Sequence, residues 1–327
     1  MTIRLNLGIK KDHARTQPGW GLKPPISWVY LIANHVSSVM NSPLATLNKI
    51  LTCSFVDGPG NRLVLFFQGC NLACSACHNP YTIGICDHCG DCVPACDPGA
   101  LTLQSNKVIF NPALCDQCDA CLTICPISAS PMTTQFSVDD ILALIRIHKP
   151  FLGGITVSGG EATMQADFVK DLFTAIKSAP DLSDLTCFID SNGMLDIAGW
   201  QNLLPVTDGV MLDIKAFAMD LQKELTGHDT SAAQNIARVL LKAGKLYEIR
   251  YLLIPGKTDN TAELDQLVAF IQSLGLDTKV RLNAFQHHGV RGLALDQDIM
   301  PKEGVDAVVE LLADAGIHNV TTPAIYQ

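Results

Sequence analysis

The cysteines of this chain constrain its fold and chemistry more than any other feature. Eleven of the 13 cysteines lie between Cys70 and Cys125, in three tight groups. Disulfide frameworks are typical of short secreted chains, and cysteines two or three residues apart are better metal ligands than disulfide partners. The spacing therefore indicates metal sites rather than crosslinks.

The first group has the spacing C-x3-C-x2-C, at Cys70, Cys74 and Cys77, within the stretch NRLVLFFQGCNLACSACHNP. Three thiols at this spacing would hold three corners of a 4Fe–4S cluster and leave the fourth iron without a protein ligand. An open iron can bind a substrate or cofactor. The motif therefore predicts a site of chemistry more than an electron carrier.

The other two groups share one pattern, C-x2-C-x2-C-x3-C, which occurs at Cys86, Cys89, Cys92 and Cys96 and again at Cys115, Cys118, Cys121 and Cys125. This duplication is the pattern of two-cluster bacterial ferredoxins, in which the fourth cysteine of each run ligates the other cluster. We therefore predict two 4Fe–4S clusters held by crossed quartets: Cys86, Cys89, Cys92 and Cys125 for one, and Cys115, Cys118, Cys121 and Cys96 for the other.

Zinc is the alternative metal for these two groups, although structural zinc sites favour paired C-x2-C knuckles separated by a longer loop. Pro126 follows the second run, whereas Asp97 and then Pro98 follow the first, which is a small departure from the ferredoxin pattern. His88 lies between two predicted ligands, and we expect a solvated loop residue there. Two cysteines, Cys53 and Cys187, lie outside the three groups, and we predict that both are small buried hydrophobic residues.

The chain divides by composition into an N-terminal extension over 1–44, a main domain over 45–327 and an insertion over 82–131. The extension is polar, is interrupted by Pro and Gly, and lacks helical or strand periodicity, so we expect it to be poorly ordered. Met40 stands just before the first convincing element. Translation from Met40 and a loosely docked arm are both compatible with this pattern.

Charge and hydropathy exclude several classes of protein. The formal net charge of −9 argues against a nucleic-acid partner. We find no apolar run near the roughly 20 residues that a membrane span needs, and no export signal. We therefore expect a cytoplasmic protein without a membrane partner.

After Ser137 the pattern alternates between helix and strand. Helices are predicted over 137–151, 166–178, 231–244, 261–274 and 302–316, with a short one near Trp200. Strands are predicted over 155–160, 185–193, 209–216, 246–256 and 279–285, with a last extended segment at 318–323. Such alternation predicts an α/β fold with a mostly parallel sheet and right-handed crossovers.

Unusual polar residues stand at the ends of five successive predicted strands: Gly159, Gly160 and Glu161; Asp190, Ser191, Asn192 and Gly193; Asp213 and Lys215; Arg250; and His287. In parallel α/β barrels the carboxyl ends of the strands face the active site. The sequence therefore predicts one polar rim that faces the three-cysteine motif.

These segments resemble a known family. CNLACSACHNP resembles the signature of radical S-adenosylmethionine (AdoMet) enzymes. VDGPGNR, SGGEAT, DSNG, MLDIK and IRYLLIPG resemble the branch that activates glycyl radical enzymes, the pyruvate formate-lyase activase-like family. The ferredoxin-like insertion and the ending NAFQHHGVRG look most like the YjjW-type activases. The resemblance covers residues 45–327 and implies a partial (β/α)6 TIM-like barrel with an inserted two-cluster ferredoxin-like module.

The resemblance also implies residue roles. Cys70, Cys74, Cys77 and Lys215 are the catalytic set, and the fourth iron is chelated by the amino and carboxylate groups of AdoMet. The implied AdoMet contacts are Ala76, Cys77, His78, Gly159, Gly160, Glu161, Asp190, Asp213, Ile214, Lys215, Arg250 and His287.

Several of these roles have a stated chemistry. The two glycines allow close approach of backbone carbonyls to the AdoMet ammonium, and Glu161 orders their loop. Asp190 and Asp213 accept hydrogen bonds from that ammonium, while Lys215 or Arg250 pairs with the carboxylate, Arg250 through a planar fork.

Four alternatives to these roles stay open. Asp213 and Lys215 are two apart on a strand, so a purely structural ion pair explains them equally. Loop packing is the alternative for His78. Related activases end the strand before His287 in Pro-Tyr-His, so Gln286 or His288 could take its place after a one-residue slip.

The implied reaction is reductive cleavage of AdoMet, followed by hydrogen abstraction from a glycine Cα of a partner glycyl radical enzyme. A reduced flavodoxin or ferredoxin is the expected electron donor, and two extra clusters would relay electrons inward. A radical AdoMet enzyme for a small molecule and an iron–sulfur electron carrier are the two alternatives.

Overall fold

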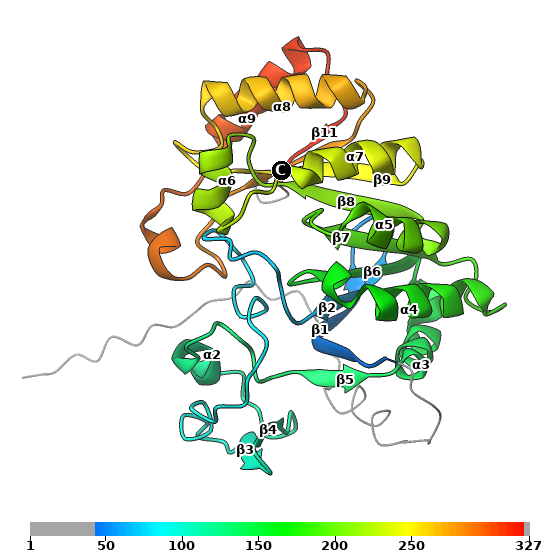
Figure 1. Cartoon of the computed structure of the whole chain (residues 1–327), viewed down its shortest axis with the longest axis vertical. Coiled ribbons are helices and arrows are strands. Elements are labelled where there is room, and N and C mark those ends of the chain that lie inside the picture. The colour runs from blue at the N-terminus through cyan, green and yellow to red at the C-terminus, as the bar shows by residue number, and fades with distance from the viewer. Residues whose placement is uncertain (1–42, 324–327) are drawn as a thin grey trace, which may run out of the picture.

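The computed structural model describes residues 43–323, and its core is one nine-stranded sheet (Figure 1). The strand order is β11-β10-β9-β8-β7-β6-β2-β1-β5. Seven of these strands run parallel as neighbours: β2 (Arg62–Phe67), β6 (Gly154–Gly159), β7 (Thr186–Ser191), β8 (Gly209–Ile214), β9 (Leu246–Leu253), β10 (Val280–Ala284) and β11 (Val320–Thr321). Two strands, β1 (Ala45–Ser54) and β5 (Thr134–Phe136), extend the sheet in antiparallel orientation. The prediction of a mostly parallel α/β sheet is confirmed.

Helices connect the parallel strands and pack on one side of the sheet (Figure 1). They are α3 (Val138–His148), α4 (Ala166–Ser178), α5 (Ile197–Leu203), α6 (Met219–Thr226), α7 (Ala232–Lys242), α8 (Thr261–Leu274) and α9 (Lys302–Asp314). Short 3-10 helices occur at Lys149–Phe151, Ala162–Gln165, Leu204–Val206 and Gly292–Asp296. Between the helices and the sheet lies one continuous apolar core, which includes Phe67, Phe168 and Trp200. In the described part of the chain, no helix is both long and apolar enough to cross a membrane.

Local signals set the helix ends where they were expected. At the start of α3 the Ser137 hydroxyl accepts from the Asp140 amide at 3.2 Å, and the Asp140 carboxylate accepts from the Ser137 amide at 2.9 Å. This reciprocal capping satisfies two amides that the helix itself cannot pair. The predicted bounds of α4 and α8 coincide with the observed ones, whereas β5 and α6 were not predicted.

The buried Arg62 joins the beginnings of three strands. Its guanidinium donates to the Thr156 hydroxyl at 2.6 Å and to the Thr186 carbonyl at 2.9 Å, and its Cζ lies 4.4 Å from the centre of the Phe188 ring. Burial lowers the pKa of Arg62 to about 10, but the group remains a cation at neutral pH. The VDGPGNR motif therefore fastens β2 to β6 and β7 at the end of the sheet opposite the cysteines.

The two isolated cysteines differ in burial. Cys187 is fully buried in β7, as predicted. The prediction for Cys53 is wrong, because its side chain is exposed. The pairing of β1 with β2 shifts register between Leu51 and Ser54, and such an irregularity breaks the alternation of buried and exposed side chains.

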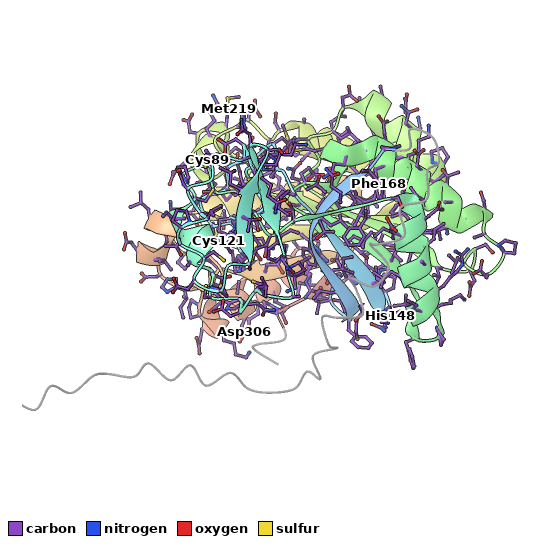
Figure 2. The ribbon with its side chains drawn as sticks, turned by 90° about the horizontal axis from the view of Figure 1, so that it is seen from below. Cys89, Cys121, His148, Phe168, Met219 and Asp306 are labelled. Atoms are coloured by element: carbon purple, nitrogen blue, oxygen red, sulfur yellow. The ribbon has the colours of Figure 1, made fainter. Side chains whose placement is uncertain are left out.

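The segment predicted as an insertion, 82–131, contains the hairpin β3 (Leu101–Gln104) and β4 (Lys107–Phe110) and the short helix α2 (Ala120–Ile124), which lie beside the sheet (Figure 1). It has its own buried cluster, made of Cys92, Leu101, Val108, Cys121 and Leu122. Figure 2 shows Cys89 and Cys121 in this segment, far from His148 at the end of α3. The extension predicted over 1–44 lies outside the described residues except for Pro43 and Leu44.

A charged hydrogen bond fastens α2 to the segment after β10. Arg291 Nη1 donates to the Leu122 carbonyl in α2 at 2.7 Å.

Substituting Arg291→Ala should make residues 82–131 more susceptible to protease, because a hydrogen bond from a charged group contributes about 1.5 kcal/mol to stability. Limited proteolysis with mapped cleavage sites measures this, and Arg146→Ala, which removes only an exposed ion pair with Asp181, is the control. Equal cleavage within 82–131 in both variants would contradict the tethering role.

Candidate cofactor cavity

A cavity of about 400 Å³ opens at the carboxyl ends of the parallel strands. Its wall contains Cys70, Cys74 and Cys77 from the loop after β2, together with residues at the ends of β6, β7, β8, β9 and β10. With one exception, all residues expected at an AdoMet site line this single cavity: Ala76, Cys77, His78, Gly159, Gly160, Glu161, Asp190, Asp213, Ile214, Lys215 and Arg250. The structure therefore brings together residues that are up to 180 positions apart (70 to 250).

The loop that carries the three cysteines has no regular structure and is held by backbone hydrogen bonds. At the start of the loop, just after β2, the Cys70 amide donates to the Ile83 carbonyl at 2.9 Å. On the other side, the amides of Ala73 and Ser75 donate to the carbonyls of Thr226 and Leu225, at 3.0 and 2.8 Å. Those carbonyls lie in the last turn of α6, where a helix has no internal partners for them. Helix α6 thus fixes the position of the cysteine loop.

The glycine pair at the end of β6 has a packing role that the sequence did not suggest. A Cβ on Gly160 would lie 2.2 Å from the Gly69 carbonyl oxygen, and one on Gly159, whose φ is +119°, would lie 2.2 Å from the Phe67 amide nitrogen. Both contacts are with backbone atoms, which cannot move aside as a side chain would. The glycines therefore let the chain after β6 lie directly against the segment that leads to Cys70.

Glu161 lines the cavity, and its carboxylate accepts several hydrogen bonds from neighbouring residues, as its expected role in ordering the glycine loop requires. Its Oε1 accepts from the Thr163 amide at 3.0 Å and from the Ser191 hydroxyl at 3.0 Å, and its Oε2 accepts from the Asn192 amide at 2.7 Å. The residue is 1% exposed, and burial raises its pKa while these hydrogen bonds act against that rise. Glu161 therefore ties the end of β6 to the end of β7.

Asp190 and Arg250 form a buried ion pair across the strands. Arg250 Nη1 lies 3.1 Å from Asp190 Oδ1, and the Ser158 hydroxyl donates to Asp190 Oδ2 at 2.8 Å. Burial raises the pKa of Asp190 to about 6, and the Arg250 charge opposes this rise. The charge of Arg250 therefore favours the ionised form of Asp190 in this buried place.

Arg250 has fewer donors left than the expected planar fork requires. Its Nε donates to Glu248 Oε1 at 2.8 Å, and its Nη2 donates to the Val56 carbonyl at 3.1 Å and to Met211 Sδ at 2.8 Å. With Nη1 bound to Asp190, four of its five N–H groups are used by described residues. One N–H group remains. Arg250 can therefore form a bidentate pair with a carboxylate only if one of these four hydrogen bonds breaks.

Asp213 and Lys215 form the ion pair that was the structural alternative for them, with 2.6 Å between Nζ and Oδ2. Both side chains also line the cavity and are just over a quarter exposed. Burial acts to lower the pKa of Lys215, but the Asp213 carboxylate outweighs it and the pKa is raised. The ammonium therefore stays charged beside the thiols, and the pair is both structural and available to a ligand.

The exception to the predicted set is His287, which does not line the cavity. Strand β10 ends at Ala284, and the chain then turns outward, so that His287 is exposed with its Nε2 2.7 Å from the Gln297 carbonyl. Gln286 and His288 do not line the cavity either, and β10 contributes Asn283 and Ala284 in their place. His78 does line it, and its ring also packs edge-to-face on Phe285 at 6.5 Å.

The chemistry of the three thiols fits an iron–sulfur cluster. All three are free cysteines on one cavity wall, and burial raises the pKa of Cys70 to about 12, with the same direction for Cys74 and Cys77. A thiolate at this place therefore needs a metal to stabilise its charge. Among residues 43–323, no three acidic, His or Cys side chains converge closely enough for a single metal ion.

The crossed quartets of the insertion are brought together around two small cavities. One is lined by Cys86, Cys89, Cys92 and Cys125, and also by Cys121. The other is lined by Cys96, Cys115, Cys118 and Cys121. Each cavity thus combines three cysteines of one run with the fourth of the other run.

His88 is not the solvated residue that was expected. It is half-buried with φ of +63°, and its Nδ1 accepts from the Val108 amide at 3.2 Å. That hydrogen bond holds the first cysteine run against β4.

Several cavity residues were missed from the sequence. Leu225 and Thr226 come from α6, Leu252 and Ile254 from the end of β9, and Asn283 from β10. Position alone could have suggested Asn283, because it stands at the carboxyl end of a predicted strand. Helix α6 had only one clear signal, Gly227, whose φ of +79° ends the helix.

Comparison with known proteins identifies a family whose matched region includes the three-cysteine loop of the cavity. A family model described as the radical SAM superfamily matches residues 64–268. The pyruvate formate-lyase-activating enzyme of Streptococcus mutans is 32% identical over 70% of this chain and 72% of its own length. The pyruvate formate-lyase 1-activating enzyme of Escherichia coli K12 is 28% identical over 76% of this chain and 83% of its own.

A solved structure supports the fold. The crystal structure of a radical SAM methyltransferase from Sphaerobacter thermophilus matches with a TM-score of 0.51 and 14% identity, over 80% of this chain and 66% of that one. Because the family model spans well over half of the residues and includes the three-cysteine loop, the chain belongs to the radical SAM superfamily and is related within it to the pyruvate formate-lyase-activating enzymes.

Proposed function

We propose that the protein activates a glycyl radical enzyme by reductive cleavage of AdoMet at the Cys70, Cys74 and Cys77 site. The observation that carries this proposal is the single cavity in which the three thiols face the ends of five parallel strands. Kinship with enzymes named for activating pyruvate formate-lyase supports it. When bound and reduced, a 4Fe–4S cluster with one open iron supplies an electron that cleaves AdoMet and yields a 5′-deoxyadenosyl radical.

The residues of the chain have distinct tasks in this proposal. Asp213 would accept a hydrogen bond from the AdoMet ammonium, and Lys215 or the remaining N–H group of Arg250 would meet the AdoMet carboxylate. Asp190 holds Arg250 in place and accepts from the AdoMet ammonium once ionised. Glycine is the favoured target of hydrogen abstraction because no side chain blocks its Cα.

We further propose that residues 82–131 are a two-cluster ferredoxin-like module, as in YjjW-type activases. A reduced flavodoxin or ferredoxin is its expected electron donor. The two cavities lined by crossed cysteine quartets support this assignment. The ligands would be Cys86, Cys89, Cys92 and Cys125 in one cluster, and Cys96, Cys115, Cys118 and Cys121 in the other.

Iron analysis of paired substitutions tests the crossing of these quartets. The wild-type chain should hold about 12 irons in three clusters. Cys96→Ala with Cys115→Ala affects one quartet and should leave about 8 irons, whereas Cys96→Ala with Cys86→Ala affects both quartets and should leave about 4. If each run held its own cluster, the two double variants would give the reverse result.

The function itself is tested by looking for the glycyl radical. Reconstituted, reduced protein is mixed without oxygen with AdoMet and a glycyl radical enzyme of the same organism, and the EPR spectrum and 5′-deoxyadenosine are measured together. We expect a new organic doublet on the partner. Deoxyadenosine without a doublet would favour a small-molecule radical enzyme, and no cleavage at full iron loading would favour an electron carrier.

A further inference from the structure

The side-chain amide of Asn192 lies against a thiol of the three-cysteine site. Its Nδ2 is 3.9 Å from Cys70 Sγ and donates to Asn71 Oδ1 at 2.8 Å. The Asn192 side chain lines the cavity, and the residue is 5% exposed. The amide is therefore a buried N–H donor beside a predicted iron ligand.

The orientation of this amide is determined by its other contacts. Asn192 Oδ1 accepts from the Met194 amide at 3.0 Å, so the oxygen end must point toward Met194. The NH₂ end then points toward Cys70, because a flipped amide would place two donors against each other at Met194 and two oxygens against each other at Asn71.

Glu161 holds the backbone from which this amide projects. Its Oε2 accepts from the Asn192 amide nitrogen and its Oε1 from the Ser191 hydroxyl, and that hydroxyl oxygen in turn accepts from the Gly193 amide at 3.0 Å. Ser191 at the end of β7 and the two residues after it are thus tied, directly or through the Ser191 hydroxyl, to one buried carboxylate. A hydrogen-bonded path therefore runs from Glu161 through Asn192 to the Cys70 thiol.

We infer that Asn192, held in place by Glu161, is a positioning residue whose N–H group supports the charge on the Cys70 sulfur and raises the reduction potential of the cluster bound there. Hydrogen bonds to ligating sulfurs stabilise the more negative, reduced state of an iron–sulfur cluster. The Leu72 amide also donates to this sulfur, at 3.4 Å. Cys70 would then be the ligand with both a backbone and a side-chain donor.

The inference rests on the proposed function, because it requires an AdoMet-binding cluster at Cys70. The test is a redox titration of the reconstituted full chain, followed by EPR. Adding AdoMet identifies the relevant signal, since only a cluster with an open iron changes its spectrum. If no wild-type signal responds to AdoMet, the proposed function fails before the inference is reached.

The main variant is Asn192→Leu, which keeps the approximate side-chain volume but has no N–H group. We expect a lower midpoint potential for the AdoMet-responsive signal, with the iron content of the wild type. Asn202→Leu is the matched control, because it makes the same substitution at an exposed residue of α5 that does not line the cavity, and it should keep the wild-type potential. An unchanged or raised potential in Asn192→Leu would overturn the inference.

Two further variants keep the test informative if Asn192→Leu does not fold. Asn192→Asp preserves the shape but replaces the donor by a carboxylate oxygen, so the potential should fall at least as far. Asn192→Ala removes the same N–H group with a smaller side chain and should lower the potential in the same direction. A potential equal to that of the wild type in both variants would refute the role of Asn192.

Discussion

The variant Cys74→Ala should lose all AdoMet cleavage. Its thiol is one of three on the cavity wall, and a cluster left with two protein ligands would not be retained at this site. We expect no 5′-deoxyadenosine by chromatography under reducing, oxygen-free conditions. The iron content should fall by about four, to the amount held in the insertion.

Cys53→Ala is the matched control for this loss. Cys53 is an exposed thiol on β1, outside all three cysteine groups, so its removal should leave iron content and cleavage unchanged. Cleavage that survives in Cys74→Ala, or that disappears equally in Cys53→Ala, would show that this triad is not the reactive site.

The variant Gly160→Ala should damage both stability and cleavage. The added Cβ would lie 2.2 Å from the Gly69 carbonyl oxygen and 2.7 Å from the Thr82 carbonyl oxygen, so the backbone before and after the cysteine loop must move. Overpacking of this kind costs about 3 kcal/mol, the upper end of its usual range, because no flexible side chain can yield. Denaturant unfolding measures the loss, and deoxyadenosine formation should fall with it.

Gly153→Ala provides the comparison just before the same strand. A Cβ there would meet its nearest atoms at 3.7 Å, which is ordinary van der Waals contact, and no positive φ is required. We expect stability within about 0.5 kcal/mol of the wild type. If Gly160→Ala were equally mild, the close approach of β6 to the cysteine loop would be refuted.

Local signals made much of the fold predictable. The capping pair Ser137 and Asp140 marks the N-terminus of α3. The Asn260 side chain caps α8 by accepting a hydrogen bond from the Glu263 amide at 3.1 Å. Strand β5 has three residues and helix α6 has eight, too few for a periodic pattern to emerge. The exposure of Cys53 depends on a register shift between two strands, which no pattern within one strand reveals.

The candidate site was predictable as a set of residues but not as a set of contacts. The carboxyl ends of parallel strands meet at one edge, so Gly160, Asp190 and Asp213 could be placed together from order alone. The pairing of Asp190 with Arg250 joins residues 60 positions apart and depends on side-chain reach. The prediction that His287 lines the cavity was wrong, because His287 lies past the end of β10, where tertiary packing determines the path of the chain.

The two ends of the insertion lie side by side. Thr82 and Gly84 both bridge to Ala129, and the Gly84 amide donates to the Ser128 carbonyl at 3.1 Å. Because the entry and exit of this segment already touch, removing it would leave a gap that a short turn could close at small entropic cost. The same geometry would let the sheet and its cysteine loop keep their register whether or not residues 82–131 are present.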